Sequence, residues 1–356
     1  MLPTVLIGVA QPVCCGVMLP RMTSTTTQNH PESVRIRATD GFSLGAVVRR
    51  HPSLSSVLHP VVIINPATSV QSHYYARFAD YLHAHGYDVL TYDYRGIGGS
   101  VDGSLRRFPA DWIDWGACDF EGVLRYVAAH FPGQPIDVVG HSVGGFVIGL
   151  ADSSHLVRRI FTMGAQFAYW RDYAPNERKG MFLRWHVAMP LLAHVFGYVP
   201  GKRLGWMEDT PKGVALDWAR MAPHFELSLR RGRKLPDDVP DRMALVRRFG
   251  QVRAPILALG IEDDPFGTVP AIDRLLDYYG HSERHHLRLT PAAIGQDAIG
   301  HFAFFHQRFR ESLWPIALGW LCNQMLPSPL PGIVRHRFPE GRTEDPANAT
   351  SQGKAS

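Results

Sequence analysis

One serine of this chain lies in a pattern that could support nucleophilic chemistry. Residues 140–144 read G-H-S-V-G, directly after the predicted buried strand 136–139, and a small-residue, helix-like pattern runs over 144–151. A serine on a tight strand-to-helix turn has its hydroxyl held clear of the sheet, and flanking glycines avoid collisions with the neighbouring strand and helix. We therefore interpret Ser142 as a candidate nucleophile.

Such a serine needs a base, because its hydroxyl is a poor nucleophile at neutral pH. The chain has 18 histidines, so position rather than residue type must select one. His301 follows the last predicted strand, and Asp263 and Asp264 follow the strand before it. The order serine, aspartate, histidine along the chain is the one expected when the nucleophile lies on this kind of turn. Asp264 is favoured as the acid that orients His301, since Pro265 fixes its loop, and Asp263 is kept as a rival.

Two backbone N–H groups are candidates for holding the oxyanion that forms when a serine attacks a carbonyl carbon. Val143 begins the predicted helix after Ser142, where the N–H has no partner within the helix and the helix dipole is positive. The second donor should come from the loop that follows the strand 61–65. In that loop we favour the N–H of Ala67, with Thr68 as the alternative.

The substrate pocket is expected to have apolar walls. The stretch 169–250 is rich in Trp, Met, His and Pro, and most of its large side chains should pack among themselves, while a few form a wall for an acyl group. The residues that we expect to contact substrate are Thr68, His141, Trp112 and Trp170.

Neither a cofactor nor a metal is expected. No set of His, Asp, Glu or Cys has convincing metal-ligand spacing in the sequence. The glycine-rich turn 96–99 lacks the full dinucleotide-binding spacing and is not followed by Lys-Ser or Lys-Thr, so we interpret it as a structural turn.

The elements that must position these residues alternate between strand and helix. A hairpin is predicted over 34–48, and buried strand-like runs then alternate with helical patterns, which predicts a mostly parallel sheet covered on both faces. The alternation stops after the sixth strand and resumes at 255–260 and 286–290. We predict an α/β fold with a helical cap inserted between the sixth and seventh major strands. The predicted parts are a disordered leader or misassigned start (1–33), the first part of the core (34–168), the cap (169–250), the second part of the core (251–326) and a flexible tail (327–356).

Composition limits the classes of partner. The chain has 356 residues, 45% apolar and 19% charged, with a net charge of +5 whose basic residues are spread out, so nucleic-acid binding is not expected. Beyond the apolar first twenty residues no uninterrupted apolar stretch is long enough to span a membrane. Four cysteines are too few for a disulfide scaffold, which favours a reducing, cytoplasmic location. The oligomeric state stays open, a homodimer included.

Together these motifs resemble the α/β-hydrolase superfamily over residues 34–320. The segment 93–100 (D-Y-R-G-I-G-G-S), the turn 140–144 and the ending G-H-F at 300–302 are similar to a bacterial group described as serine aminopeptidase-like or esterase-like hydrolases. The loop 65–69 (N-P-A-T-S) is similar to the oxyanion loop of homoserine O-acetyltransferases and departs from the His-Gly loop of lipases. The resemblance implies an α/β-hydrolase fold and acyl chemistry at Ser142.

The expected function is that of a serine hydrolase. It would cleave a carboxylic ester, or a thioester, of a small and largely apolar substrate through a Ser-His-Asp triad and an acyl-enzyme. One alternative is an acyltransferase that delivers the acyl group to a small-molecule acceptor. The other is a binding protein that keeps the fold without catalysis, because fold alone does not select among these functions.

Overall fold

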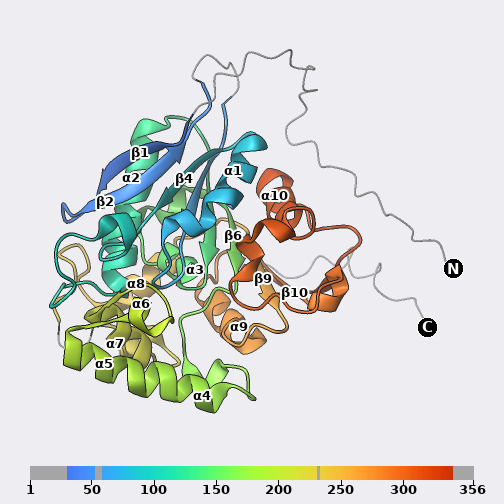
Figure 1. Ribbon diagram of the computed structural model, residues 1–356. Coiled ribbons are helices and arrows are strands. Elements are labelled where there is room, and N and C mark those ends of the chain that lie inside the picture. Colours follow the sequence, from blue (N-terminus) through green and yellow to red (C-terminus); the bar gives the residue numbers. More distant parts are fainter. Residues whose placement is uncertain (1–29, 53–57, 231–232, 340–356) are drawn as a thin grey trace.

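The computed structural model describes residues 30–52, 58–230 and 233–339, and a twisted nine-stranded sheet runs through its centre (Figure 1). The strand order is β1-β2-β4-β3-β5-β6-β9-β10-β11. The six strands from β4 to β10 in this order are parallel, while β1, β2 and β11 are antiparallel to their neighbours. The strands are β1 (Glu32–Arg37), β2 (Ser43–Arg49), β3 (Val61–Asn65), β4 (Asp88–Tyr92), β5 (Ile136–His141), β6 (Val157–Met163), β9 (Ile256–Ile261), β10 (Arg284–Leu289) and β11 (Gly332–Arg337).

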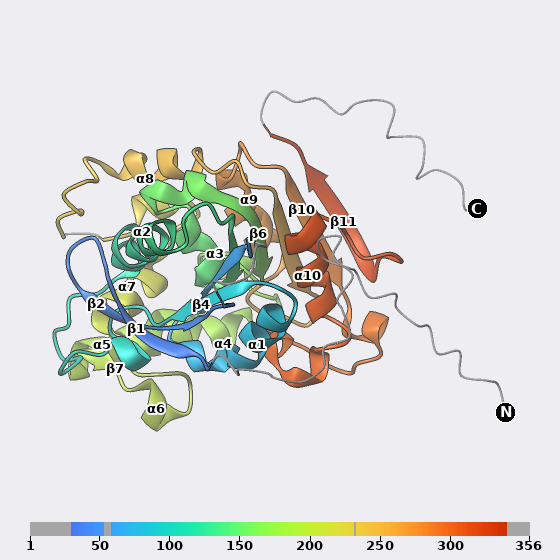
Figure 2. The same cartoon turned by 90° about the horizontal axis from the view of Figure 1, so that it is seen from above.

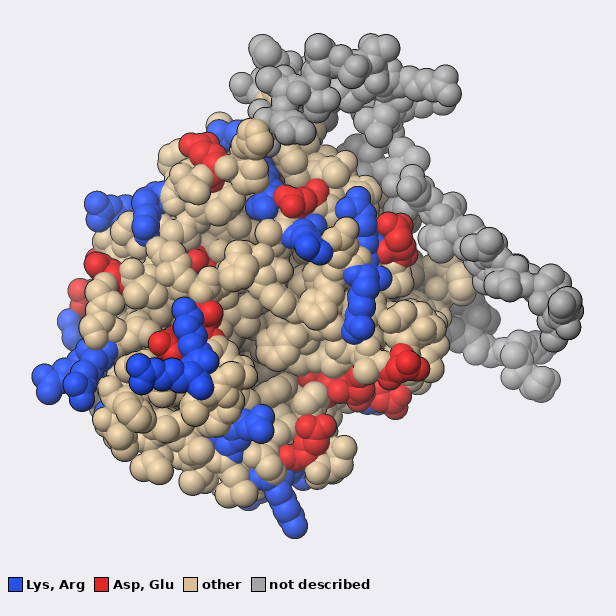
Figure 3. Space-filling model, viewed as in Figure 1, with Lys and Arg blue, Asp and Glu red and all other residues tan. Residues whose placement is uncertain are grey.

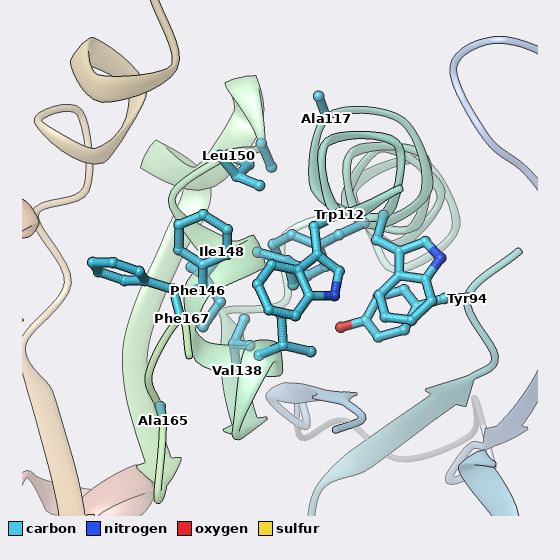
Figure 4. Packing of buried hydrophobic residues seen from close by; sticks show 14 of the residues in the cluster. Tyr94, Trp112, Ala117, Val138, Phe146, Ile148, Leu150, Ala165 and Phe167 are labelled. Atoms are coloured by element: carbon cyan, nitrogen blue, oxygen red, sulfur yellow. The ribbon is translucent and has the colours of Figure 1, made fainter. Parts of the chain in front are cut away.

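Helices cover both faces of the sheet, as its doubly buried strands require. Along β3, Val61 and Ile63 face one apolar cluster, and Val62 and Ile64 face the other. Figure 4 shows part of the first cluster, where Trp112, Phe146 and Phe167 pack beside β5. The first cluster includes α2 (Glu121–His130), α3 (Val143–Ile148) and α9 (Val269–Tyr278), and the second includes α1 (Ala76–Ala84) and α10 (Trp314–Asn323). The predicted α/β-hydrolase architecture, with its N-terminal hairpin, is confirmed.

The segment between β6 and β9 is mainly helical, and we refer to residues 169–250 as the cap. A π-helical turn, 183–188, joins its first two helices into one continuous rod. The segment, predicted to be a helical cap, also contains two two-residue strands, β7 (Tyr198–Val199) and β8 (Thr210–Pro211), which pair with each other. Its helices are α4 (Arg178–Phe182), α5 (Met189–Phe196), α6 (Gly201–Leu204), α7 (Lys212–Arg220) and α8 (Arg242–Phe249).

The expectation of a flexible tail from residue 327 is wrong for residues 332–337. They form β11, which pairs antiparallel with β10 along its whole length (Figure 2). Without β11, β10 would be an open edge of the sheet with unpaired backbone N–H and C=O groups, and the pairing satisfies these groups. The Pro-rich, polar composition of the tail does not predict a strand there. The leader up to residue 29 and the end of the tail from residue 340 lie outside the described residues. No described helix has the length and apolarity needed to cross a bilayer.

Candidate active site

Ser142 lies on a strained turn between β5 and α3. Its φ of 55° and ψ of −121° are a conformation that non-glycine residues rarely adopt. A Cβ at Gly140 would lie 2.7 Å from Gly145 N, and one at Gly144 would lie 2.2 Å from Asn65 O. Both glycines are therefore needed because helix α3 and strand β3 approach the turn closely, as the sequence predicts.

Asp264 faces His301, at the carboxyl end of β9. The distance between Asp264 Oδ2 and His301 Nδ1 is 2.7 Å, and both side chains are buried. The other carboxylate oxygen, Oδ1, accepts hydrogen bonds from the backbone N–H groups of Phe266 (2.8 Å) and Gly267 (2.9 Å). The carboxylate is thus held in a fixed direction, and it fixes the His301 ring with Nδ1–H toward it and Nε2 away from it.

Asp263 has a different role, although it is the next residue. Its side chain is exposed, and its two oxygens accept hydrogen bonds from the backbone N–H groups of Ile299 (2.8 Å) and Gly300 (2.9 Å). These residues directly precede His301, so Asp263 holds the loop while Asp264 holds the ring. Of the two aspartates that the sequence left open, the structure places Asp264 against the imidazole.

Two glycines that the sequence analysis missed pack against this pair. Gly164 follows β6 and has a φ of 56°, and a Cβ there would lie 2.7 Å from Asp264 Oδ2 and 3.0 Å from His301 Nδ1. A Cβ at Gly267 would lie 2.5 Å from the same carboxylate oxygen. The Asp264–His301 pair therefore occupies a slot that has no room for side chains at these positions.

The N–H of Ala67 is already used, so its favoured role as an oxyanion donor is not supported. It donates a hydrogen bond to the hydroxyl oxygen of Tyr75 at 2.9 Å, deep in the core. Thr68, the alternative, lines the same cavity as Ser142, and its N–H has no hydrogen-bond partner among the described residues. Val143 also lines the cavity and is the first residue of α3, where the N–H is free of helix partners.

His141 does not reach the cavity, which corrects the expectation that it contacts substrate. It is fully buried, and burial together with the nearby His301 holds its pKa well below the usual range, so the ring is neutral. Its Nε2 lies 2.9 Å from the carbonyl oxygen of His301, which can only accept, so Nε2 carries the proton. Nδ1 then accepts from the Tyr75 hydroxyl at 2.8 Å. A directed chain of hydrogen bonds thus ties Ala67 through Tyr75 and His141 to the backbone of His301.

A buried glutamine that the sequence analysis did not single out contacts the nucleophile. Gln166 Nε2 lies 3.4 Å from Ser142 Oγ, and Gln166 Oε1 accepts a hydrogen bond from the N–H of Ala168. Because that N–H can only donate, the amide orientation is fixed and a donor faces the serine. Among the described residues, the hydroxyl of Ser142 bonds the side chain of Gln166 and makes no hydrogen bond to His301. Ser142 and His301 nevertheless line the same cavity. Hydrogen bonds between nucleophile and base often tighten only when substrate binds.

The cavity above Ser142 has a volume of about 370 Å³ and lies between the sheet and the cap. Trp112 lines it, as expected, whereas Trp170 does not. A 3₁₀ turn begins at Trp170, and its ring packs against Phe182, with centroids 4.8 Å apart. The Trp, Phe and Met side chains of the wall are Trp112, Trp185, Trp206, Trp218, Phe266, Phe302, Met181 and Met207.

A buried charge cluster fastens the cap to the core behind Trp112. The guanidinium of Arg230 donates to both carboxylate oxygens of Asp111 at 2.8 Å and also to Asp114. The carboxylate of Asp217, on α7, accepts from the N–H groups of Trp112 (3.2 Å) and Arg230 (3.1 Å). Burial and the nearby Asp111 raise the pKa of Asp217 to about 8 and that of Asp114 to about 7. Both shifts favour the protonated form of these carboxyl groups, and the hydrogen bond from the Trp112 N–H to Asp217 ties the cluster to a residue that lines the cavity.

Within residues 30–52, 58–230 and 233–339, three side chains of the types that bind metals come together, although the sequence spacing indicated no such group. One ligand atom each of His51, His83 and Asp88 lies within 4.8 Å of the others, at the start of β4 and so at the opposite end of this strand from the active-site loops. Asp88 Oδ1 bonds His51 Nδ1 at 3.0 Å, and His83 Nδ1 bonds the carbonyl oxygen of Tyr87 at 3.0 Å. Hydrogen bonding within the protein accounts for this group.

Comparisons with known proteins show the family of this chain and agree with its fold. Residues 58–293 match the model of the family described as serine aminopeptidase, S33, which is more than half of the chain, so the protein belongs to this family of hydrolases. The fold is similar to that of the esterase Pf2001 from Pyrococcus furiosus, with a TM-score of 0.51 and 16% sequence identity over 86% of this chain and 99% of that chain. It is also similar to DcsB, solved in complex with its substrate analogue, with a TM-score of 0.52 and 15% identity over 83% of this chain and 100% of that chain. The comparison with curated protein sequences found no match.

Proposed function

We propose that this hydrolase cleaves carboxylic esters, or thioesters, of small and largely apolar substrates. The observation that carries the proposal is the buried Asp264–His301 pair, with 2.7 Å between Oδ2 and Nδ1, in which His301 lines the same cavity as Ser142. An imidazole whose Nδ1 is held by a carboxylate presents Nε2 as a base. A serine on a strained turn at a helix N-terminus is the matching nucleophile.

The proposed reaction has two halves. Ser142 Oγ attacks the carbonyl carbon while His301 Nε2 takes its proton, and the imidazolium then donates that proton to the leaving alcohol or thiol. The oxyanion is held by the N–H groups of Val143 and Thr68. Water, deprotonated by His301, then attacks the acyl-enzyme, and Ser142 is regenerated with release of a carboxylic acid.

The cavity wall supports an apolar acyl group. It is formed mainly by aromatic rings and methionines, and its carboxylate, Glu177, is exposed to solvent. An aminopeptidase would need a carboxylate close to the nucleophile to bind the free amine of its substrate, and a solvated carboxylate is a weak partner for that purpose. The alternatives of acyl transfer and of binding without catalysis remain as outcomes of the test below.

The test is hydrolysis of p-nitrophenyl esters from acetate to palmitate by the wild type and Ser142→Ala. We expect serine-dependent turnover, with kcat lowered by about 10⁴ or more in the variant and a nearly unchanged melting temperature, because alanine keeps the backbone contacts of the turn. A fluorophosphonate should label only the wild type. Product that requires an added alcohol or amine would indicate an acyltransferase, and a folded protein with neither turnover nor labelling would refute catalysis.

A further inference from the structure

The rod formed by α4, the π-helical turn and α5 has an apolar outer face. Five of its large apolar side chains are between 42% and 64% exposed, in a segment of only 19 residues. Lone exposed apolar side chains are ordinary, but a contiguous stripe marks an interaction surface. The side chains of this stripe, which we call the outer stripe, are Leu183, Val187, Leu191, Val195 and Phe196.

The outer stripe is not the side of the rod that packs on the protein. Leu183, Val187, Leu191 and Val195 recur every four residues, so they share one face. A second series with the same spacing, offset by two residues, is buried against the rest of the cap. The buried series consists of Met181, Trp185, Met189 and Ala193. A helix that is apolar on both sides is normally covered on both sides. We therefore expect the outer stripe to contact an apolar environment outside this protein chain.

Cations outnumber anions in the segment that carries the outer stripe. Residues 177–209 contain five Lys and Arg residues against Glu177, Glu208 and Asp209, and Glu208 pairs with Lys202 at 2.7 Å. In Figure 3 the lower part of the molecule, where α4 and α5 lie in Figure 1, is mainly uncharged surface with scattered basic and acidic groups. The five basic residues are Arg178, Lys179, Arg184, Lys202 and Arg203. An apolar stripe flanked by cations is typical of helices that lie in the interface of an anionic bilayer.

The same rod forms one wall of the active-site cavity. Met181, Arg184 and Trp185 line the cavity. The guanidinium of Arg184 lies 5.7 Å from the ring centroid of Trp185 and 5.8 Å from that of Trp206, so it lies where the rod meets the loop after α6. A surface bound to the outer stripe would therefore lie beside the cavity. An apolar substrate could pass from that surface into the cavity.

We propose that the outer stripe docks the protein on the surface of an anionic lipid bilayer. The rod lies in the headgroup region with its apolar side chains inserted, and the basic residues beside it contact anionic headgroups. A second copy of this chain fits less well, because a two-fold pairing through the stripe would bring two basic surfaces together. The delivery of an apolar ester from the bilayer to Ser142 rests on the proposed function, whereas the docking does not.

The experiment is co-sedimentation of the full chain with vesicles of phosphatidylcholine alone and of phosphatidylcholine with 30 mol% phosphatidylglycerol. We expect binding to the anionic vesicles that weakens with salt and is much weaker on neutral ones. Leu191→Asp combined with Val195→Asp should weaken the binding roughly tenfold or more, because two apolar groups are replaced by charges that oppose insertion. Lys179→Gln combined with Arg203→Gln should weaken binding to anionic vesicles only.

The matched control is Met243→Asp on α8, a helix that lies on the other side of the cap in Figure 2; Met243 is 50% exposed. It is compared with Leu191→Asp alone, which adds the same single charge at an exposed apolar site, and it should leave vesicle binding nearly unchanged where Leu191→Asp weakens it. Turnover of a water-soluble p-nitrophenyl ester should be equal in all variants, so loss of docking and loss of catalysis are separable. Equal sedimentation of Leu191→Asp/Val195→Asp and the wild type, or no binding to either vesicle, would overturn the proposal. A dimer in light scattering that this double variant dissociates would assign the stripe to a second copy instead.

Discussion

The loops at the carboxyl edge of the sheet and the cap hold their side chains in different ways. On the sheet side, Asp264 and His301 are fixed by backbone N–H groups and by glycines that leave no spare room. On the cap side, aromatic rings pack against one another, as Trp185 does on Trp218 with centroids 4.9 Å apart. Backbone-held groups tolerate little change, whereas packed rings can be exchanged at a modest cost. The first arrangement suits chemistry, which needs a fixed geometry, and the second suits the recognition of apolar groups of varied shape.

The largest expected effect on activity comes from replacing one of two adjacent aspartates and not the other. Asp264→Asn should lower kcat/KM by about 10⁴, because the amide no longer holds His301 in the tautomer that presents Nε2 as a base. Asp263→Asn should lower it by less than about tenfold, since it keeps one acceptor for the loop before His301. The measurement is steady-state hydrolysis of one ester by both variants, with melting curves. Equal losses would show that the position of the loop, and not the tautomer of the ring, is what matters.

A smaller effect is expected from a single methyl group beside the catalytic pair. Gly164→Ala would place a Cβ 2.7 Å from Asp264 Oδ2, at a φ of 56° that already strains an alanine. We expect kcat to fall by about 10–10² and the protein to lose about 1–3 kcal/mol of stability, because the pair must move by a fraction of an ångström. Gly180→Ala, where the space around the Cβ is open, is the control. Wild-type kcat in Gly164→Ala would mean that the slot around the pair is not rigid.

The sequence was sufficient for the parts of the site that depend on local pattern. The turn at Ser142, the positions of Asp264 and His301 after successive strands, and the helical segment between β6 and β9 all follow from periodicity and from the order of strands. What it could not indicate are pairings between distant polar residues. The hydrogen bond from Ala67 N–H to Tyr75 is one example, and the inward direction of His141 is another.

The same limit explains two further misses. The charge cluster joins Asp111 to Arg230 across more than a hundred residues, and no spacing rule relates positions so far apart. β11 was missed because its strand character is weak on its own and depends on the open edge of β10. In physical terms, local propensity is readable from sequence, whereas partners fixed by tertiary packing are not.

Substitution of a cap residue that lines the cavity should change substrate preference with little loss of catalysis. Trp206 lines the cavity and is only half-buried, so Trp206→Ala should enlarge the cavity without unfolding the cap. We expect the ratio of kcat/KM for long over short acyl chains to change by about tenfold, while turnover of the best ester stays within a few-fold. Trp170→Ala, which removes an indole that does not line the cavity, should leave the ratio unchanged. An equal shift in both variants would mean that the cap reorganises as a whole.

The smallest effect concerns the charge cluster that fastens the cap. Because the pKa of Asp217 is raised to about 8, the folded protein keeps a proton that the unfolded chain releases near pH 4. Stability from this group is therefore present at low pH and is lost as pH rises from about 4 to about 8. Asp217→Asn removes this titration, although it also weakens one hydrogen bond to a backbone N–H at every pH.

The informative quantity is consequently the change of melting temperature with pH and not its absolute value. The wild type should lose more stability between pH 5 and pH 9 than Asp217→Asn does, whereas Asp102→Asn, at an exposed site, should follow the wild-type curve. Parallel curves for all three proteins would show that Asp217 is charged throughout, held by its two N–H donors. In that case the cap would be held by a cluster in which Asp217 does not titrate, and any effect of pH on the position of Trp112 would come from other groups.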